Sequence, residues 1–213
     1  MSDSRLARPS VVPYVTAWDS ERAGLLGDLV LRRRPQLHIA YADERPDDRD
    51  DDGVLIGRIS ASPGQGRALY REMHVRRQYE CMTNLLCQIC GEPASENTDG
   101  VLFLDWRHRK SPATWPERSL TKMPPLCEPC AVRSIAECPH LANEPTCAAI
   151  RTPDPRAWGV SGSLYRPVKG GWYCYPGTAE IPYGDFRLHA MVSSALMVEL
   201  TNVTRVSVED LAS

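Results

Sequence analysis

The chain has 213 residues, of which 42% are hydrophobic, and its formal net charge at pH 7 is -2. This length is sufficient for one sizeable hydrophobic core, or for one core with a small satellite built around a metal. The small net charge excludes a general electrostatic attraction to nucleic acid, so any such binding requires a local cluster of basic residues.

Composition also bears on compartment and origin. The longest apolar runs, such as residues 193–200, fall far short of the ~18 residues needed to span a bilayer, and no charged start with an apolar segment opens the chain. We therefore expect a cytoplasmic protein that does not contact a membrane. Arginine outnumbers lysine 22 to 3, which is typical of a GC-rich genome and favours a bacterial or phage origin.

The first part of the chain predicts short strands. Residues 10–18, 37–42 and 53–60 are rich in β-branched and aromatic side chains and are bounded by Pro, Gly and Asp. An acidic loop separates the last two. After the breaker sequence SPGQG, apolar residues at near-helical spacing predict a helix over about 66–86.

The middle of the chain is rich in cysteine. It runs over 87–140 and contains one apolar strand candidate, GVLFLDW at 100–106. Residues 143–158 show little pattern and are interpreted as a loop that separates this middle part from the tail.

The tail predicts a hairpin, a helix and a strand. Two apolar segments flank a Lys-Gly-Gly turn at 169–171 and are typical of a β-hairpin. An amphipathic pattern predicts a helix around 185–200, and RVSV near the end predicts a last strand. The chain therefore mixes helices and strands, and we find no internal repeat.

Four of the eight cysteines form two Cys-x-x-Cys pairs, Cys87 with Cys90 and Cys127 with Cys130. Gly91 eases the tight turn of a zinc knuckle, in which backbone N–H groups donate to the two sulfurs. The second pair leads directly into a short predicted helix, whose N-terminal dipole favours thiolates. The four thiolates predict one closed, structural Zn2+ site.

The order of knuckle, hairpin and helix resembles that of treble-clef zinc proteins, over roughly residues 85–140. Many of these are HNH or endonuclease VII-like nucleases, in which a hairpin His and a helix His or Asn act on a phosphodiester with a divalent metal. The hairpin here carries Asp105 and His108 as candidate catalytic residues, but Trp106 stands where the family has His beside the Asp. Ala131 stands where the helix ligand is common, so the resemblance implies a zinc module with incomplete catalytic residues.

We therefore expect an α+β fold in which short antiparallel strands and a few helices surround a central treble-clef-like zinc module. The predicted organisation is a β-rich region ending in a helix (1–86), the four-cysteine module (87–142), and a region of hairpin, helix and strand (143–213). The first and last regions are expected to pack together as one domain.

Other interpretations of the cysteines stay open. Cys127 and Cys130 have the Cys-x-Pro-Cys form of thioredoxin-like proteins, although the two prolines at 124–125 cannot continue the buried strand that such a pair should follow. A rubredoxin-like iron site uses similar pairs, and unpaired buried cysteines are the plainest alternative. Cys138, His140 and Cys147 are candidates for a second zinc site.

The acidic loop invites a calcium interpretation. Asp48, Asp50, Asp52 and Gly53 match the opening of an EF-hand loop, but Ile59 stands where the bidentate Glu should be. A solvated loop is the favoured interpretation.

Two clusters of basic residues are candidates for a nucleic-acid surface. The first lies at 67–77. The second lies in the hairpin segment after Asp105, where Trp106 and Trp115 accompany the cations, and aromatic rings among cations suit a phosphate backbone with stacked bases. The candidate nucleic-acid-binding residues of the second cluster are Arg107, Arg109, Lys110, Arg118 and Lys122. A solvated surface that carries Arg for genomic reasons is the alternative.

These observations favour a zinc-binding protein that acts as a non-catalytic module for binding nucleic acid or a protein partner. An HNH-like metal-dependent nuclease is the first alternative. A biosynthetic enzyme with a structural zinc is the second, because the regions outside the cysteine-rich part carry no recognisable motif. Oligomeric state is not predicted.

Overall fold

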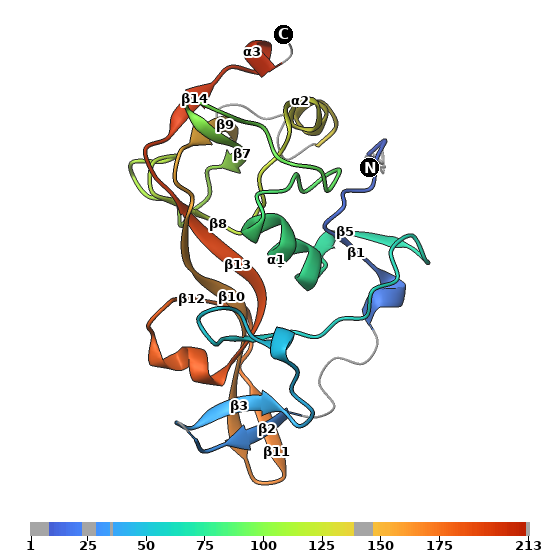
Figure 1. Ribbon diagram of the computed structural model, residues 1–213, viewed down its shortest axis with the longest axis vertical. Coiled ribbons are helices and arrows are strands. Elements are labelled where there is room, and N and C mark those ends of the chain that lie inside the picture. The colour runs from blue at the N-terminus through green and yellow to red at the C-terminus, as the bar shows by residue number, and fades with distance from the viewer. Residues whose placement is uncertain (1–8, 23–28, 35, 139–146, 212–213) are drawn as a thin grey trace, which may run out of the picture.

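The computed structural model describes residues 9–22, 29–34, 36–138 and 147–211. Within them the chain is mostly sheet with three α-helices, in agreement with the predicted α+β class. The molecule is elongated, with α2 and α3 near one end and the pair β2–β3 at the other (Figure 1).

Two long antiparallel strands, β10 (Arg156–Val168) and β13 (Met191–Leu200), run through the middle of the molecule (Figure 1). The two strands approach each other closely at Gly162, where an added Cβ would lie 2.2 Å from the carbonyl oxygen of Val192. The sheet order is β11-β10-β13-β4, with β12 added to β10 and β8 to β13. Besides β10 and β13, the strands of this sheet are β11 (Gly171–Cys174), β4 (Leu55–Ile56), β12 (Ala179–Pro182) and β8 (Ser119–Thr121).

A second sheet, in the order β14-β9-β7-β6, carries the cysteine-rich part of the chain. Its strands are β6 (Glu96–Asn97), β7 (Gly100–Trp106), β9 (Cys147–Thr152) and β14 (Thr204–Val206). Strand β7 is buried on both faces: Phe103 packs into the main core, whereas Leu102 packs beneath the helix α2 (Glu128–Glu137). Burial on both faces explains why its sequence is continuously apolar instead of alternating.

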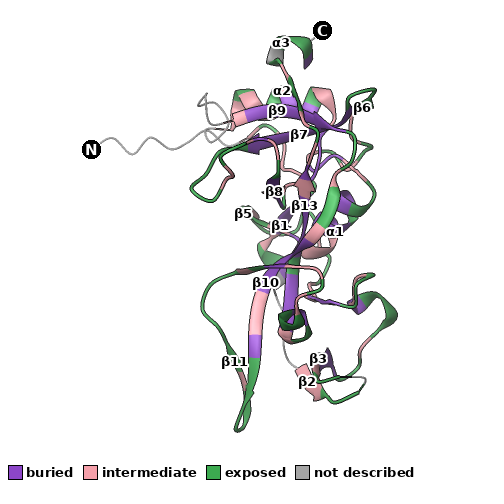
Figure 2. Cartoon of the chain, turned by 90° about the vertical axis from the view of Figure 1, so that its left-hand side faces the viewer, coloured by how far each residue is buried: buried purple, intermediate pink, exposed green. Residues whose placement is uncertain are grey.

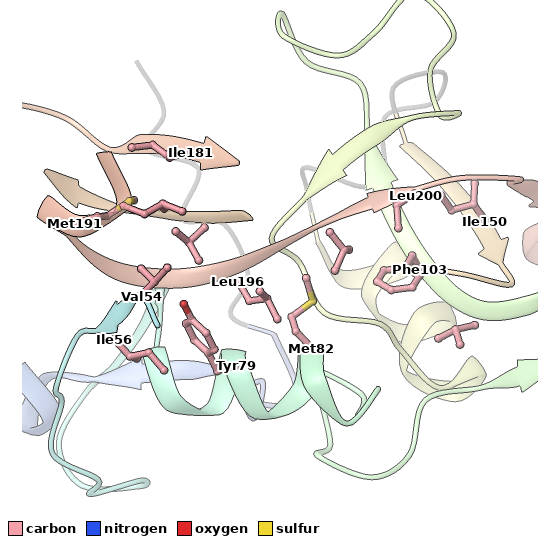
Figure 3. Close-up of a cluster of buried hydrophobic side chains, with 14 of the residues drawn as sticks. Val54, Ile56, Tyr79, Met82, Phe103, Ile150, Ile181, Met191, Leu196 and Leu200 are labelled. Atoms are coloured by element: carbon pink, nitrogen blue, oxygen red, sulfur yellow. The ribbon is translucent and has the colours of Figure 1, made fainter. Parts of the chain in front are cut away.

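The main core lies between these two sheets and the helix α1 (Val75–Thr83), as Figure 3 shows. Tyr79 and Met82 reach into it from α1, and Tyr79 Oη lies 2.5 Å from Ser193 Oγ on β13. The fully buried Gln78 bridges two parts of the chain, since its amide donates to the carbonyls of Lys122 and Leu196 and accepts from the Leu196 N–H.

Two smaller apolar clusters extend the core to the ends of the molecule. One lies under α2 and includes Leu126, Ala149 and Leu211, the last from α3 (Val208–Leu211). The other surrounds Tyr41 and Trp172 at the far end, where the Trp172 indole donates to the Leu29 carbonyl.

The remaining elements form two small antiparallel sheets and three short 3-10 turns. The sheets pair β1 (Thr16–Trp18) with β5 (Ala68–Met73), and β2 (Leu29–Arg32) with β3 (His38–Tyr41). The turns are η1 (Asp19–Arg22), η2 (Pro46–Asp48) and η3 (Phe186–Ala190).

Several element predictions are confirmed and others are wrong. The strand at 100–106 and the hairpin around the Lys-Gly-Gly turn are confirmed. The helix expected over 66–86 is a strand, β5, followed by the shorter α1. The helix expected around 185–200 is η3 followed by β13. Strand β13 is buried along most of its length, so its apolar residues do not alternate, and their spacing resembles that of a helix.

The N-terminal strands are also shorter than expected, and a strand within 143–158 was missed. Only Thr16–Trp18 of the strand expected at 10–18 is extended in a sheet, and only Leu55–Ile56 of the one expected at 53–60. Strand β9, at Cys147–Thr152, lies in the segment interpreted as a loop, because its alanines have low β propensity.

The sheet pairings cross the predicted domain boundaries. Strand β7, from the 87–142 region, pairs with β9 from 143–213, and β8 pairs with β13. The division into three regions stays a prediction. Among the described residues, no helix is both long enough and apolar enough to cross a membrane.

Candidate metal centre

The first cysteine pair lies in a tight knuckle between α1 and β6. Leu86 forms an isolated antiparallel bridge with Pro93, and the Cys87 N–H donates to the Glu92 carbonyl at 2.7 Å. Gly91 closes the turn with φ of 78° and donates to the Cys87 carbonyl at 2.8 Å. The positive φ explains the glycine at this position.

The second pair lies at the start of α2. Cys127 is the N-cap residue and its carbonyl accepts from the Ala131 N–H at 2.9 Å, so Cys130 falls in the first turn of the helix. Pro124 and Pro125, which precede the second pair, accept hydrogen bonds from the knuckle through their carbonyls. Gln88 donates its backbone N–H to Pro125 at 3.0 Å and its side-chain amide to Pro124 at 2.8 Å.

The four sulfurs converge on one point. The ligand atoms of Cys87, Cys90, Cys127 and Cys130 all lie within 4.8 Å of one another, and the sulfurs of Cys90 and Cys127 are 3.8 Å apart. A tetrahedral zinc–thiolate centre with Zn–S bonds of about 2.3 Å places its sulfurs about 3.8 Å apart. None of these four cysteines is in a disulfide, so the spacing is that of metal ligands.

The electrostatics of the cluster favour a bound cation. Burial raises the pKa of the Cys87 thiol, but N–H groups of Cys127, Cys90 and Ile89 donate to its sulfur and more than offset this, so that its pKa lies below the usual range. The pKa of Cys130 is raised by burial and by the neighbouring cysteines. Four thiolates this close repel one another, and a divalent ion removes that repulsion.

The donor set limits the metals that fit to those that take four thiolates, such as zinc or iron. Soft thiolate ligands in a closed tetrahedron select zinc over the hard ions Mg2+ and Ca2+, which take oxygen ligands. Cys87 and Cys130 are buried, Cys127 is half-buried and Cys90 is exposed, so the centre lies at the edge of the module. The residues present thus fit a zinc ion with no position left for a substrate.

A buried arginine supports the helix that carries the second pair. Arg151 on β9 is 3% exposed and donates to Glu128 Oε1 at 2.6 Å. It also donates to the hydroxyl of Ser95 at 3.0 Å and the carbonyl of Gly100 at 3.0 Å, and the Ser95 hydroxyl donates to the same Glu128 oxygen. This network fixes the first turn of α2, next to Cys127. Sequence reasoning missed it because β9 was interpreted as a loop.

An N-terminal segment covers the outer side of the knuckle. The N–H groups of Tyr14 and Val15 donate to the carbonyls of Ile89 and Gln88. The Tyr14 ring lies against Gly91, where an added Cβ would come within 3.2 Å of it, and its hydroxyl donates to Glu80 at 2.7 Å. The segment was expected to be a strand, and it contributes instead to the shape of the metal centre.

Neither Cys138 nor Cys147 belongs to this cluster. Among the described residues, the four cysteines form the only group of three or more that could hold a metal. Cys138 follows α2 and Cys147 begins β9, whereas His140 lies outside the described residues. The second zinc site stays a prediction.

The candidate catalytic residues of the hairpin serve the fold in different ways. Asp105 is 4% exposed, and its Oδ2 accepts from the Trp115 indole at 2.8 Å and from the Ser119 hydroxyl at 2.6 Å. Burial raises the pKa of this carboxyl. His108 is exposed, and its Nδ1 accepts from the Lys110 N–H at 3.1 Å. His108 is near enough to act electrostatically on Asp105, but the hydrogen bonds of the Asp105 carboxylate go to Trp115 and Ser119.

The five candidate nucleic-acid-binding residues are all exposed. Within the described part of the chain, Arg107 and Arg109 have no hydrogen-bond or ion-pair partner, whereas Lys110 pairs with Glu180 at 3.0 Å. Arg118 pairs with Glu199 at 2.9 Å, and Lys122 has no acidic partner. The two unpaired arginines follow Trp106, which is 36% exposed.

The other basic cluster, at 67–77, is only partly exposed. Arg77 is buried and forms a bidentate pair with the fully buried Glu21, at 2.9 and 2.8 Å. His74 is buried beside it, and the half-buried Arg76 pairs with Asp48. Arg67 and Arg71 are exposed, so they are the two arginines of this cluster that face solvent fully.

The acidic loop is exposed over most of its length, as expected of a solvated loop, but two of its carboxylates are used inside the fold. Asp48 is 1% exposed and pairs with Arg58 at 2.5 Å. Asp50 accepts from the Val54 N–H and from the Tyr183 hydroxyl. With these carboxylates already paired, nothing in the loop supports a calcium site.

No family model matches this chain, and neither the curated proteins nor the solved structures contain a match to it. The functional conclusion therefore depends on the geometry alone.

Proposed function

We propose that the chain is a zinc-binding protein in which a treble-clef-like module, held by Cys87, Cys90, Cys127 and Cys130, presents a basic surface to nucleic acid. The observation that carries the zinc assignment is the convergence of four sulfurs within 4.8 Å. The treble-clef likeness is supported by the order of the elements, which is the knuckle, the hairpin β6–β7 and then α2. Four thiolates leave no open position, so the role of the ion is structural.

The basic surface consists of the segment between β7 and β8. Arg107 and Arg109 are exposed cations without acidic partners among the described residues, and the exposed ring of Trp106 precedes them. Arg205 stacks on Trp115 at 4.9 Å, which adds a further cation to this part of the molecule. Cations beside an exposed ring suit a phosphate backbone with a stacked base.

The structure favours a binding function over the nuclease alternative. An HNH-like site needs polar groups that face the substrate, but Asp105 is buried and bonded to Trp115 and Ser119. Ala131, at the usual position of the helix ligand, is fully buried in the cluster under α2. Neither residue can reach a phosphodiester at the surface.

Salt-dependent binding of a labelled oligonucleotide tests the proposal. The affinity should fall steeply with added salt, and reversing the charge at Arg107 and Arg109 should reduce both the affinity and the salt slope. Arg156→Glu is a control, because Arg156 is an exposed arginine outside the segment between β7 and β8 and forms an ion pair with its neighbour Asp154. Absence of binding to single- and double-stranded oligonucleotides at low salt would reassign the surface to a protein partner.

A further inference from the structure

A cavity of about 470 Å3 lies away from the zinc module, in the part of the molecule that contains β2 and β3 (Figure 1). Three separate segments line it: the start of β3, the loop that precedes β4, and η3 with the residues before it. No residue of the metal centre or of the proposed basic surface takes part. A volume of this size is within the range of pockets that hold small molecules.

Phe186 lines this cavity and is the most exposed large apolar residue of the described chain, at 81%. The backbone at Phe186 is held in place, because Leu188 packs into the main core and Asp185, just before η3, caps the turn by accepting from the Arg187 N–H. An aromatic ring that the protein itself does not cover is suited to stacking on a planar ligand.

The polar groups of the cavity are oriented by hydrogen bonds. His38 Nδ1 lies 2.8 Å from the Gln36 carbonyl, which can only accept, so the neutral ring presents Nε2 as an acceptor. His189 Nε2 lies 3.3 Å from the Gln36 amide nitrogen, which donates, so this ring presents Nδ1–H as a donor. The Asp52 carboxylate also lines the cavity and has no ion-pair partner among the described residues.

Two cations stand beside these groups in the chain. Arg33 and Arg34 lie in the short connection between β2 and β3, which also contains Gln36, and both are exposed without a partner among the described residues. Arg49 lines the cavity but is not available, because Glu44 holds its guanidinium in a bidentate pair at 2.8 and 2.9 Å. Arg33 and Arg34 do not line the cavity themselves, but they lie close in the chain to the lining residue Gln36 and are the exposed cations suited to an anionic group outside it.

We infer that this cavity binds a nucleotide unit, with the base on Phe186, its polar edge on His38, His189 and Asp52, and its phosphate toward Arg33 and Arg34. The exposed ring suits a planar ligand, and the mixture of donors and acceptors suits the edge of a heterocycle. The arginines suit an anionic group. The unit comes either from a free nucleotide or from a single strand, since both have the same chemistry.

Calorimetric titration of the zinc-loaded full chain with AMP, GMP, adenosine and inorganic phosphate tests the inference. The monophosphates should bind more tightly than adenosine or phosphate alone. Stacking on an aromatic ring contributes about 1–3 kcal/mol per base, so Phe186→Ala should weaken monophosphate binding roughly 5- to 150-fold. Replacing Arg33 and Arg34 with Ala should weaken the monophosphates but not adenosine. Tyr70→Ala, which removes an exposed ring on β5, outside both proposed sites, should leave both unchanged.

A labelled oligo(dA) separates the two sources of the nucleotide. Displacement of the oligonucleotide by AMP indicates a site for free nucleotides, whereas Phe186-dependent oligonucleotide binding that AMP does not displace indicates a strand. Either result supports the inference. It is overturned if neither the monophosphates nor oligo(dA) binds at millimolar concentration, or if Phe186→Ala binds as well as the parent chain while unfolding at the same urea concentration. Arg107 and Arg109 variants should alter only the oligonucleotide, so failure of the cavity and failure of the zinc-module surface are distinguishable.

Discussion

The pair formed by Arg151 and Glu128 predicts an asymmetric response to mutation. Arg151 is 3% exposed at its side chain whereas Glu128 is 45% exposed, although the two lie only 2.6 Å apart. Removing the carboxylate leaves a buried cation without a counter-ion. Removing the arginine leaves a carboxylate that water can reach.

The magnitudes follow from that difference in burial. Breaking a buried pair by removing one partner costs about 3–5 kcal/mol, and because Arg151 keeps its bonds to Ser95 and Gly100 we expect Glu128→Ala to cost about 3 kcal/mol. Arg151→Met keeps most of the side-chain stem but removes the bonds to Glu128, to Gly100 O and to the hydroxyl and carbonyl of Ser95. The Ser95 carbonyl still accepts from the Leu102 N–H and the Ser95 hydroxyl still donates to Glu128, so we expect a cost of about 1–2 kcal/mol.

Urea unfolding of the zinc-loaded protein, followed by tryptophan fluorescence, measures these costs. In the double variant, Glu128→Ala should add less than about 1 kcal/mol to Arg151→Met, since no buried cation remains to be left unpaired. A chromophoric chelator measures zinc affinity in the same variants, and Glu128→Ala should weaken it the most. The reasoning is refuted if Arg151→Met costs as much as Glu128→Ala, or if the two costs simply add.

Three further predictions concern other parts of the fold. Burial alone would raise the pKa of Glu21, but hydrogen bonds from Arg77, Trp18 and Ser62 lower it from 4.5 to about 2. The contribution of Glu21 to stability is therefore complete above pH 4.5 and is lost as the pH falls toward 2. Acid unfolding should show this loss of stability, and Glu21→Gln should abolish the pH dependence. Gly91→Ala should destabilise the zinc-loaded protein by about 1–2 kcal/mol in urea unfolding, because alanine is strained at a φ of 78°. No plasmid nicking is expected with Mg2+ or Mn2+, and cleavage that disappears in His108→Ala would contradict the binding function.

The sequence predicted the parts of the fold whose signals are local. The two cysteine pairs and Gly91 identified the knuckle, and the positive φ of that glycine shows why the pattern was informative. Strand β7 was recognisable from its continuous apolar run. The β10–β11 hairpin was recognisable from the glycine turn between its two strands.

The parts that were missed depend on contacts between distant segments. Strand β13 is buried by β10 and α1 together, so its residues lack the alternation that marks a half-exposed strand. Arg151 lies in a segment that was interpreted as a loop, and Asp48 in one that was interpreted as a solvated loop. Each is nevertheless buried against a partner that is distant in the chain or lies across a loop. The cavity beside Phe186 combines three segments, and no local pattern in the sequence indicates that they meet.

The zinc content of the purified chain tests the central claim most directly. The account predicts about one zinc per chain from the four thiolates of a closed site. Cys87→Ser and Cys127→Ser should lose the metal and become protease-sensitive around the knuckle and α2, whereas Cys81→Ser and Cys174→Ser, outside the cluster, should keep it. Iron in place of zinc would favour a rubredoxin-like centre. A metal-free chain with Cys127 and Cys130 in a reversible disulfide would contradict the account.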